Sequence, residues 1–200
     1  NFTIKRKPLY CSSRHGVLMK EHIVKFPVRV TKFKQHNELK DKLLDAIARQ
    51  EQVEHMQGPN NDITRCDWGP MRFDRSREWL SLIGIDLYDH LGTWCKTLGY
   101  HDFNIHEIWF QQYQTGSKHS WHVHGANFTN VYYLDLPKDS PKTEWVDPAT
   151  QEVHYFDVEE GDIITFPSWL IHRAPENQSQ EMKSIISWNM DVILTDFYGE

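Results

Sequence analysis

The sequence predicts a mainly β fold with flanking helices, and three observations support this class. Helical periodicity is confined to the first half of the chain, and from about residue 103 the apolar runs are short and bounded by turn residues. Helices followed by many short strands are typical of a sheet sandwich braced by helices on one side. A length of 200 residues suffices for the core of one sandwich or barrel. We expect a single domain, residues 1–200, with an N-terminal arm and buttressing helices to about residue 102 and the β core over about 103–194.

The first half contains a basic arm, two predicted helices and a loop. Pro27, inside the strand-like run HIVKFPVRVTKF, indicates an edge strand or an irregular arm. A helix is expected from Asn37, a candidate N-cap, to about residue 55, because it carries one apolar stripe: Leu39, Leu43, Leu44 and Ile47. A second stripe predicts a helix that closes at Gly99: Leu87, Leu91, Trp94, Cys95 and Leu98. The segment Gly58–Pro70 is rich in turn residues and long enough to be a lid, with a disordered connector as the alternative.

The second half shows short runs that are typical of strands. We predict strands near Asn104–Tyr113, Trp121–Gly125, Asn130–Leu136, Val153–Asp157, Asp162–Phe166 and Lys183–Leu194. The segment TEWVDPATQE, residues 143–152, is expected to form a hairpin.

Composition limits the function classes. Lys and Arg total 22 against 28 Asp and Glu, a net charge of −6, so no basic stripe favours binding to a phosphate backbone. We find neither a membrane-spanning apolar run nor the apolar region of a signal peptide. Cys11, Cys66 and Cys95 lie far apart and form no CxxC pair, which is typical of buried or incidental thiols in a reducing compartment. We expect a cytoplasmic protein, and the sequence does not specify its oligomeric state.

Two blocks carry the candidate chemistry. In YQTGSKHSWHVH, residues 113–124, His122 and His124 are two residues apart, and a strand turns both side chains to the same face. In GDIITFPSWLIH, residues 161–172, a short apolar strand precedes His172. Three imidazoles leave coordination positions open, as a catalytic metal requires. His119, three residues before His122, is expected on the opposite strand face, in a structural or exposed role.

The last predicted strand has two different faces. Alternation places Lys183, Ser187 and Asn189 on one face and apolar residues on the other: Ile186, Trp188, Met190 and Val192. A buried lysine needs an anionic partner, so this face either lines a ligand pocket or is solvated on an outer strand. Trp121 and Trp169 flank the candidate metal ligands, where they either wall the site or pack in the core.

The order of the motifs over about Tyr113–Asn189 resembles a known family. Tyr113, two residues, Gly116, five residues and His122 are followed by the strand YYLD, the block ending in His172, and the strand KSIISWN. These motifs are similar to those of Fe(II)- and 2-oxoglutarate-dependent oxygenases, in particular prolyl-hydroxylase-like members and a bacterial and phage subgroup with an HxH metal motif. The resemblance implies a double-stranded β-helix core, a cupin-like jelly roll.

The resemblance also implies a metal site and two departures from the usual pattern. Its Fe(II) ligands would be His122, His124 and His172, with His124 at the position of the usual carboxylate. If His124 points away, Asp135 on the next strand is the alternative carboxylate. Lys183 stands where the family usually has an arginine for the distal carboxylate of 2-oxoglutarate.

The same resemblance assigns cosubstrate contacts. Tyr133 and Ser187 would hydrogen-bond the carboxylate that Lys183 binds, and Tyr113 would lie near the metal-bound end. Asn127 and Arg173 are lesser candidates for contact with cosubstrate or substrate.

The activity implied is that of a dioxygenase that uses Fe(II), 2-oxoglutarate and dioxygen, hydroxylates a substrate, and releases succinate and carbon dioxide. Its substrate would be a small molecule, a protein side chain or a nucleotide base. Two alternatives stay open. A three-histidine cupin-type metal dioxygenase would not use 2-oxoglutarate and would not need Lys183 at the metal, because Gly116 followed by HxH and Gly161 followed by Pro167 and His172 also fit cupin motifs. A non-enzymatic jelly-roll binding module is the other.

Overall fold

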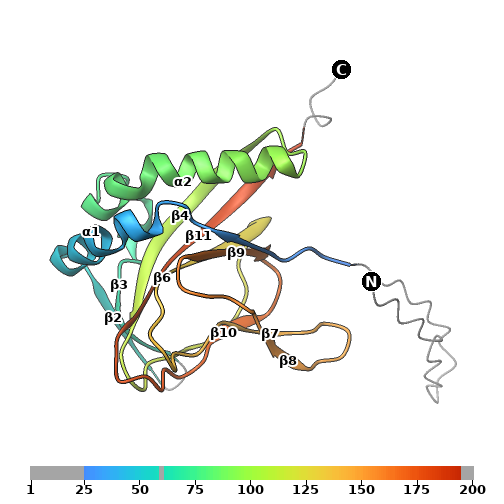
Figure 1. Ribbon diagram of the computed structural model, residues 1–200. Helices are drawn as coiled ribbons and strands as arrows, with labels where there is room; N and C mark the ends of the chain where they lie inside the picture. Colours follow the sequence, from blue (N-terminus) through green and yellow to red (C-terminus); the bar gives the residue numbers. More distant parts are fainter. Residues whose placement is uncertain (1–24, 59–60, 195–200) are drawn as a thin grey trace, which may run out of the picture.

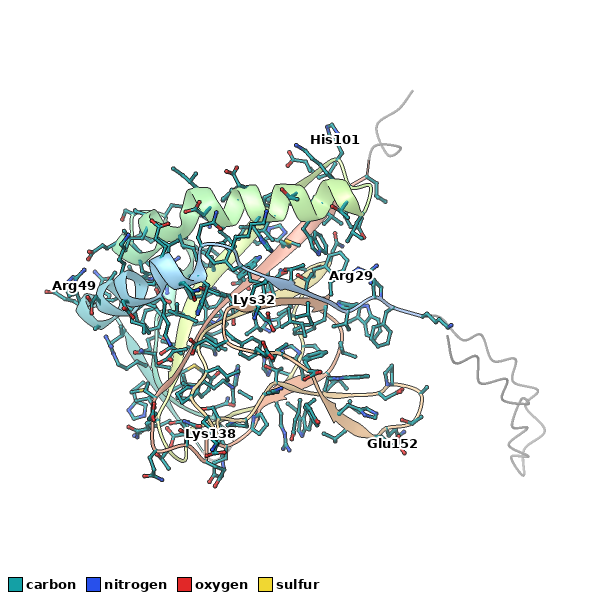
Figure 2. All side chains as sticks on the ribbon, viewed as in Figure 1. Arg29, Lys32, Arg49, His101, Lys138 and Glu152 are labelled. Carbon is teal, nitrogen blue, oxygen red and sulfur yellow. The ribbon has the colours of Figure 1, made fainter. Side chains whose placement is uncertain are left out.

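Two antiparallel sheets form the core of the molecule. The computed structural model describes residues 25–58 and 61–194, so most of the basic arm, with Cys11, lies outside the described residues. Both helices lie on one side of the larger sheet, and the smaller sheet lies on the other side (Figure 1). Side chains fill the space between the two sheets (Figure 2). This arrangement confirms the predicted mainly β fold with flanking helices.

The strands pair antiparallel in both sheets. The order in the larger sheet is β1 (Arg29–Lys32), β9 (Asp162–Pro167), β6 (Phe128–Asp135), β11 (Lys183–Ile193), β4 (Asp102–Tyr113), β3 (Asp62–Cys66) and β2 (Glu54–Gln57). The order in the smaller sheet is β5 (His119–His122), β10 (His172–Ala174), β7 (Glu144–Val146) and β8 (Val153–Tyr155). The predicted hairpin is the β7–β8 pair, and the edge strand predicted from Pro27 is β1.

The helices follow the predicted apolar stripes, with shifted ends. Helix α1 (His36–Arg49) begins after Gln35 instead of Asn37, and it ends well before residue 55 because the chain enters β2 at Glu54. A short 3-10 helix, η1 (Pro70–Phe73), precedes α2 (Glu78–Thr97). Gly99 follows α2 with φ of 79°, a conformation that glycine adopts without steric cost, so the predicted end is confirmed. Neither helix in the described chain is long and apolar enough to cross a membrane.

Strand β11 separates two apolar clusters. Ile186 and Trp188 pack with Leu43 of α1 and Leu87 of α2 on the helical side of the larger sheet. Ile185 faces the other way, into the cluster between the sheets. Burial of a leucine or isoleucine contributes roughly 1.5–3 kcal/mol. The predicted alternation of β11 is therefore confirmed, and its polar residues Lys183, Ser187 and Asn189 lie on the side of the smaller sheet.

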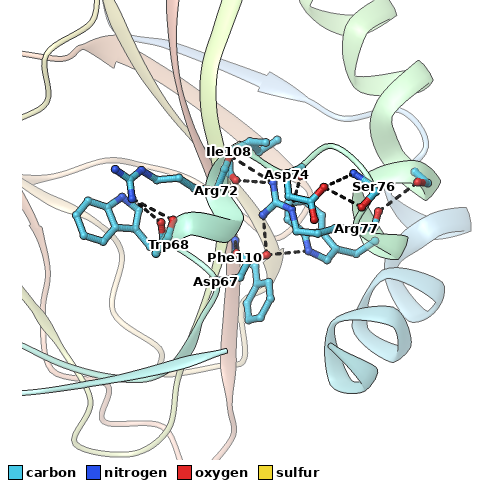
Figure 3. A network of polar contacts seen from close by, with 11 residues as sticks. Asp67, Trp68, Arg72, Asp74, Ser76, Arg77, Ile108 and Phe110 are labelled. Carbon is cyan, nitrogen blue, oxygen red and sulfur yellow. Dashed lines mark hydrogen bonds and ion pairs between the residues drawn. The ribbon is translucent and has the colours of Figure 1, made fainter. Parts of the chain in front are cut away.

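The prediction that Gly58–Pro70 forms a lid has to be corrected. The described part of Gly58–Pro70 includes β3, which pairs with β4, so its backbone hydrogen bonds belong to the larger sheet. Asp67, after β3, is fully buried, where it accepts hydrogen bonds from Arg77 at 2.6 Å, Trp79 at 3.0 Å and the Phe110 amide at 2.8 Å (Figure 3). These contacts anchor the segment to β4 and α2. The turn residues around it concealed a five-residue strand.

Candidate metal centre

Three histidines from two segments meet between the sheets. His122 ends β5 and His172 begins β10, and the two residues are paired directly across the antiparallel ladder. His124 lies beyond β5, and its backbone amide donates to the Ser168 carbonyl at 2.9 Å. One ring nitrogen from each histidine lies within 4.8 Å of the other two. The structure thus brings together the three residues that the sequence singled out as metal ligands.

Backbone carbonyls fix the proton on two of the three rings. Nδ1 of His122 lies 2.6 Å from the Ser120 carbonyl oxygen, and Nδ1 of His172 lies 2.8 Å from that of Leu170. A carbonyl only accepts, so Nδ1 is the donor in both rings, and a neutral ring then has its lone pair on Nε2. Metal-bound histidines usually have this kind of support on the second nitrogen. Both rings are prepared to bind a metal through Nε2.

Burial keeps these imidazoles neutral at pH 7. Desolvation is the largest cause of the lowered pKa of His122. Desolvation also lowers the pKa of His124 to about 4, and repulsion from the neighbouring His122 lowers it further. Burial, then repulsion from the other rings, holds the pKa of His172 well below its usual value. Neutral imidazole is the form that binds metals.

The predicted position of His119, on the opposite face of the strand, also has to be corrected. Its ring stacks on His122 with centroids 4.0 Å apart and an interplanar angle of 24°, so it does not point to the opposite face. The reason is an irregularity in the ladder: His122 pairs with His172 and His119 with Ala174, so three steps along β5 match two along β10. Such a bulge changes which residues share a face. His119 lines the same cavity but supplies no atom to the group of three ligands.

Lys183 is a buried cation that contacts Tyr113 but is not among the residues that line the cavity. The side chain is 1% exposed, and its Nζ donates to the Pro141 carbonyl at 2.6 Å. The ammonium also lies 5.6 Å from the ring centre of Tyr113 and 5.9 Å from that of Tyr133. Burial lowers the pKa of Lys183 to about 8. No carboxylate within the described residues forms an ion pair with it, an unusual state for a buried lysine.

The other predicted cosubstrate contacts are placed differently. Tyr113 and Ser187 line the cavity with the histidines. Tyr133 lies behind it and donates from its hydroxyl to Thr143 Oγ1 at 2.8 Å. The Asn127 side chain does not line the cavity, and its carbonyl accepts from the Val192 amide at 3.0 Å. Its contact with cosubstrate stays a prediction that this placement does not support.

The remaining candidates lie at the margin or away from the site. Arg173 lines the cavity, pairs with Glu144 at 2.7 Å, and has its guanidinium 4.4 Å from the centre of the exposed Trp121 ring. Asp135 pairs with Lys40 of α1 at 2.8 Å and does not join the three histidines, so it is not the alternative carboxylate ligand.

Aromatic residues do enclose the histidines, but they are not the predicted pair. Trp169 is 52% exposed and Trp121 36%. The buried Phe166 instead packs edge-on against His172, with centroids 4.8 Å apart, and the buried Trp109 lies 5.9 Å from His124. Trp109 belongs to a row of alternate residues on β4, Glu107, Trp109, Gln111 and Tyr113, of which sequence reasoning singled out Tyr113 alone. The same alternation that was applied to β11 would have found it.

The motifs and this geometry match a known family. A family model described as "Putative 2OG-Fe(II) oxygenase" matches residues 107–189, the segment that contains the three histidines and Lys183. Over this segment the chain is similar to the 2OG-Fe(II) oxygenase family. No curated protein matches the chain in sequence.

Solved structures share the fold of this chain. A Pseudomonas putida prolyl-4-hydroxylase is 14% identical, with a TM-score of 0.60 over 81% of this chain and 91% of the other. The viral collagen prolyl hydroxylase of Paramecium Bursaria Chlorella virus-1, in a 2OG complex, is 16% identical, with a TM-score of 0.57 over 84% and 96%. The alpha ketoglutarate dependent epimerase SnoN from nogalamycin biosynthesis is 11% identical, with a TM-score of 0.63 over 82% and 76%. At these identities the likeness concerns the fold alone.

The matched family implies Fe(II) and 2-oxoglutarate, and the residues of this chain fit both. Three neutral imidazoles that converge from two strands suit a first-row divalent metal. The buried Lys183, which has no ion-pair partner among the described residues, suits a carboxylate. The cavity that the histidines line is small, about 30 Å³, and Lys183 is not among its lining residues, so a five-carbon diacid that contacts both fits only if side chains move.

Proposed function

We propose that the chain is an Fe(II)- and 2-oxoglutarate-dependent dioxygenase that hydroxylates its substrate and releases succinate and carbon dioxide. The convergence of His122, His124 and His172 is the observation that carries this proposal. The buried Lys183, which has no ion-pair partner among the described residues, supports it. Bound iron with 2-oxoglutarate and dioxygen would supply the oxidising chemistry. The protein's own part is to hold the metal, orient the cosubstrate and keep water out.

The ligand roles follow from the ring orientations. His122 and His172 would bind iron through Nε2, because the Ser120 and Leu170 carbonyls hold their Nδ1 protons. His124 would be the third ligand. Three protein ligands leave coordination positions for cosubstrate and dioxygen. The aromatic side chains of Trp109 and Phe166 keep bulk water from the rings, which protects a reactive centre from side reactions.

Cosubstrate binding would centre on Lys183. The lysine would pair with the distal carboxylate of 2-oxoglutarate, which compensates for the burial of its charge. Tyr113 and Ser187, both on the cavity wall, would add hydrogen bonds. Tyr133 would act indirectly through Thr143, which lines the cavity and whose Oγ1 accepts a hydrogen bond from the tyrosine hydroxyl.

The test is cosubstrate binding without turnover. Calorimetry with N-oxalylglycine on the Mn(II)-loaded protein should show binding in the wild type and a loss of about 100-fold or more in Lys183→Ala, because the ligand carboxylate would then be buried unpaired. Lys183→Arg should keep most of the affinity. Lys142→Ala, which removes a cation near the exposed Tyr155 ring, is the matched control and should bind normally. Succinate production under air in the presence of Fe(II) and 2-oxoglutarate then tests the reaction itself.

A three-histidine cupin-type dioxygenase is the second candidate, because no carboxylate in the described chain joins the three imidazoles. Such an enzyme would bind metal normally but show no affinity for N-oxalylglycine in the wild type. The same calorimetry therefore separates the two candidates.

The substrate we propose is a small molecule or a protein side chain. One structural match of similar fold is a Trichoplax adhaerens prolyl hydroxylase bound to a peptide of hypoxia inducible factor, and another is the nogalamycin epimerase. The shared fold therefore accommodates both classes. A screen for substrate-stimulated succinate formation with peptide and metabolite pools would distinguish them.

A further inference from the structure

His124 differs from the other two candidate ligands in what faces its Nδ1. His122 and His172 each point Nδ1 at a backbone carbonyl, which accepts a hydrogen bond from it. Nδ1 of His124 lies 3.3 Å from Nδ2 of Asn189, an amide nitrogen that only donates. The third ring is therefore held by a side chain from β11, and with the opposite hydrogen-bond polarity.

The orientation of the Asn189 amide is set by its neighbours. Its Nδ2 also donates to Glu107 Oε1 at 2.6 Å, and its Oδ1 accepts from Thr129 Oγ1 at 2.9 Å. Arg72 Nε donates to the other oxygen of Glu107, Oε2, at 2.6 Å. If the amide were turned over, its oxygen would lie against an anionic oxygen at the same short separation. The Arg72–Glu107 pair thus forces the donor side of Asn189 toward His124.

The proton position on His124 follows. A ring whose Nδ1 accepts a hydrogen bond and which is neutral must carry its proton on Nε2. That nitrogen is the one with which His122 and His172 are free to bind a metal. His124 is therefore held in the tautomer that has no lone pair on Nε2.

We propose that Asn189 is a positioning residue that holds the proton of His124 on Nε2 and so keeps this ring from binding metal through Nε2 until the amide turns. The proposal rests on the proposed metal site but not on the identity of the cosubstrate. It makes His122 and His172 the permanent ligands and His124 a conditional one, controlled from Glu107 on β4.

The residues around Asn189 can accommodate its side-chain amide in two orientations. Thr129 Oγ1, on the far side of Asn189, lies 2.8 Å from Ser168 Oγ, and a hydroxyl can accept as well as donate. A turned amide could donate to Thr129, which would then donate to Ser168. Among the described residues that contact the amide nitrogen, Glu107 Oε1 opposes the turn, and His124 Nδ1 does so until its proton moves.

The first test is the tautomer of each histidine in the metal-free protein. Long-range ¹H–¹⁵N correlation spectra distinguish Nδ1–H from Nε2–H imidazoles. We expect the Nδ1–H form for His122 and His172 and the Nε2–H form for His124. In Glu107→Gln, which keeps the shape and removes the charge, His124 should shift toward the Nδ1–H form. A wild-type His124 in the Nδ1–H form would overturn the proposal, and this result is independent of any oxygenase activity.

The second test is metal affinity, measured with Zn(II) or Co(II) alone. Mutation of a residue that supports a metal ligand by a hydrogen bond normally lowers metal affinity by about 10–100-fold. Asn189→Ala should instead bind metal about fivefold tighter, because one opposing hydrogen bond is gone. Asn130→Ala is the matched control: this buried asparagine accepts from Thr165 Oγ1 at 2.6 Å and contacts no histidine, so its affinity should not change. Unchanged or weaker binding by Asn189→Ala, with Asn130→Ala normal, would contradict the proposal.

Should Asn189→Ala fail to fold, Glu107→Gln carries the same prediction. It should bind Zn(II) more tightly than the wild type, and equal or weaker binding would again contradict the role of Asn189.

Discussion

His122 and His172 face each other across the β5–β10 ladder, with their ring centroids 4.3 Å apart. Fifty residues separate them in sequence, and the pairing of two short strands fixes their relative position. A substitution at either residue therefore tests the metal site without disturbing a long element.

Replacement of His172 by alanine should reduce Zn(II) or Mn(II) affinity by more than about 100-fold, since it removes a ligand and not only its support. His119→Ala is the matched control, because this ring stacks on His122 but supplies no ligand atom. Calorimetric titration of both variants measures the difference. Equal losses in the two variants would show that His119 is itself a ligand.

Lys183→Met should stabilise the protein below about pH 8, because the folded state no longer has to bury a charge. The pKa of Lys183 falls from 10.5 to about 8 on folding, so the unfolded chain binds more protons between these values. The cost to the wild type is therefore fully present below pH 8 and disappears as the pH rises toward 10.5. The shift corresponds to roughly 3 kcal/mol at neutral pH. Urea unfolding of both proteins at pH 7 and pH 10 should show a difference that shrinks at the higher pH.

The metal-free protein should lose stability as the pH falls below 6.5. Burial lowers the pKa of His119 to about 3 and that of His124 to about 4, so the unfolded chain binds more protons in this range and stability rises with pH. His119→Gln should reduce the slope between pH 4 and 6 by up to about 1.4 kcal/mol per pH unit. Unfolding free energies in the presence of a chelator provide the measurement. An unchanged slope would mean that His119 is protonated in the folded protein.

The side chains of Asp67 and Arg77 are both fully buried and form an ion pair (Figure 3). Asp67→Ala should therefore destabilise the protein by about 3–5 kcal/mol, because it leaves the buried charge of Arg77 without its partner. The matched control is Glu78→Ala, which breaks the exposed pair with Arg49 at the end of α1 (Figure 2) and should change stability little. Thermal unfolding of the two variants measures the contrast. Similar shifts in both would contradict the anchoring role of Asp67.

Period-two alternation predicted much of the site from sequence. It placed Lys183, Ser187 and Asn189 on one face of β11, and the HxH spacing brought His122 and His124 to one point. The same rule failed at His119, because a bulge in β5 adds one residue and shifts the faces. It also failed at residues 62–66, where flanking Gly, Pro and Asn residues suggested a loop but β4 offered an edge for pairing.

The sequence by itself determined the mainly β class, the two blocks that deliver three histidines, and the shared face of Lys183, Ser187 and Asn189, because these depend on local periodicity and residue chemistry. Only the tertiary structure decided how each ring is oriented. The Ser120 and Leu170 carbonyls fix His122 and His172, whereas Asn189 and Glu107 fix His124 from strands far away in sequence. Hydrogen-bond polarity depends on which atom lies opposite, and contacts between distant strands are not encoded in the spacing of residues along one of them.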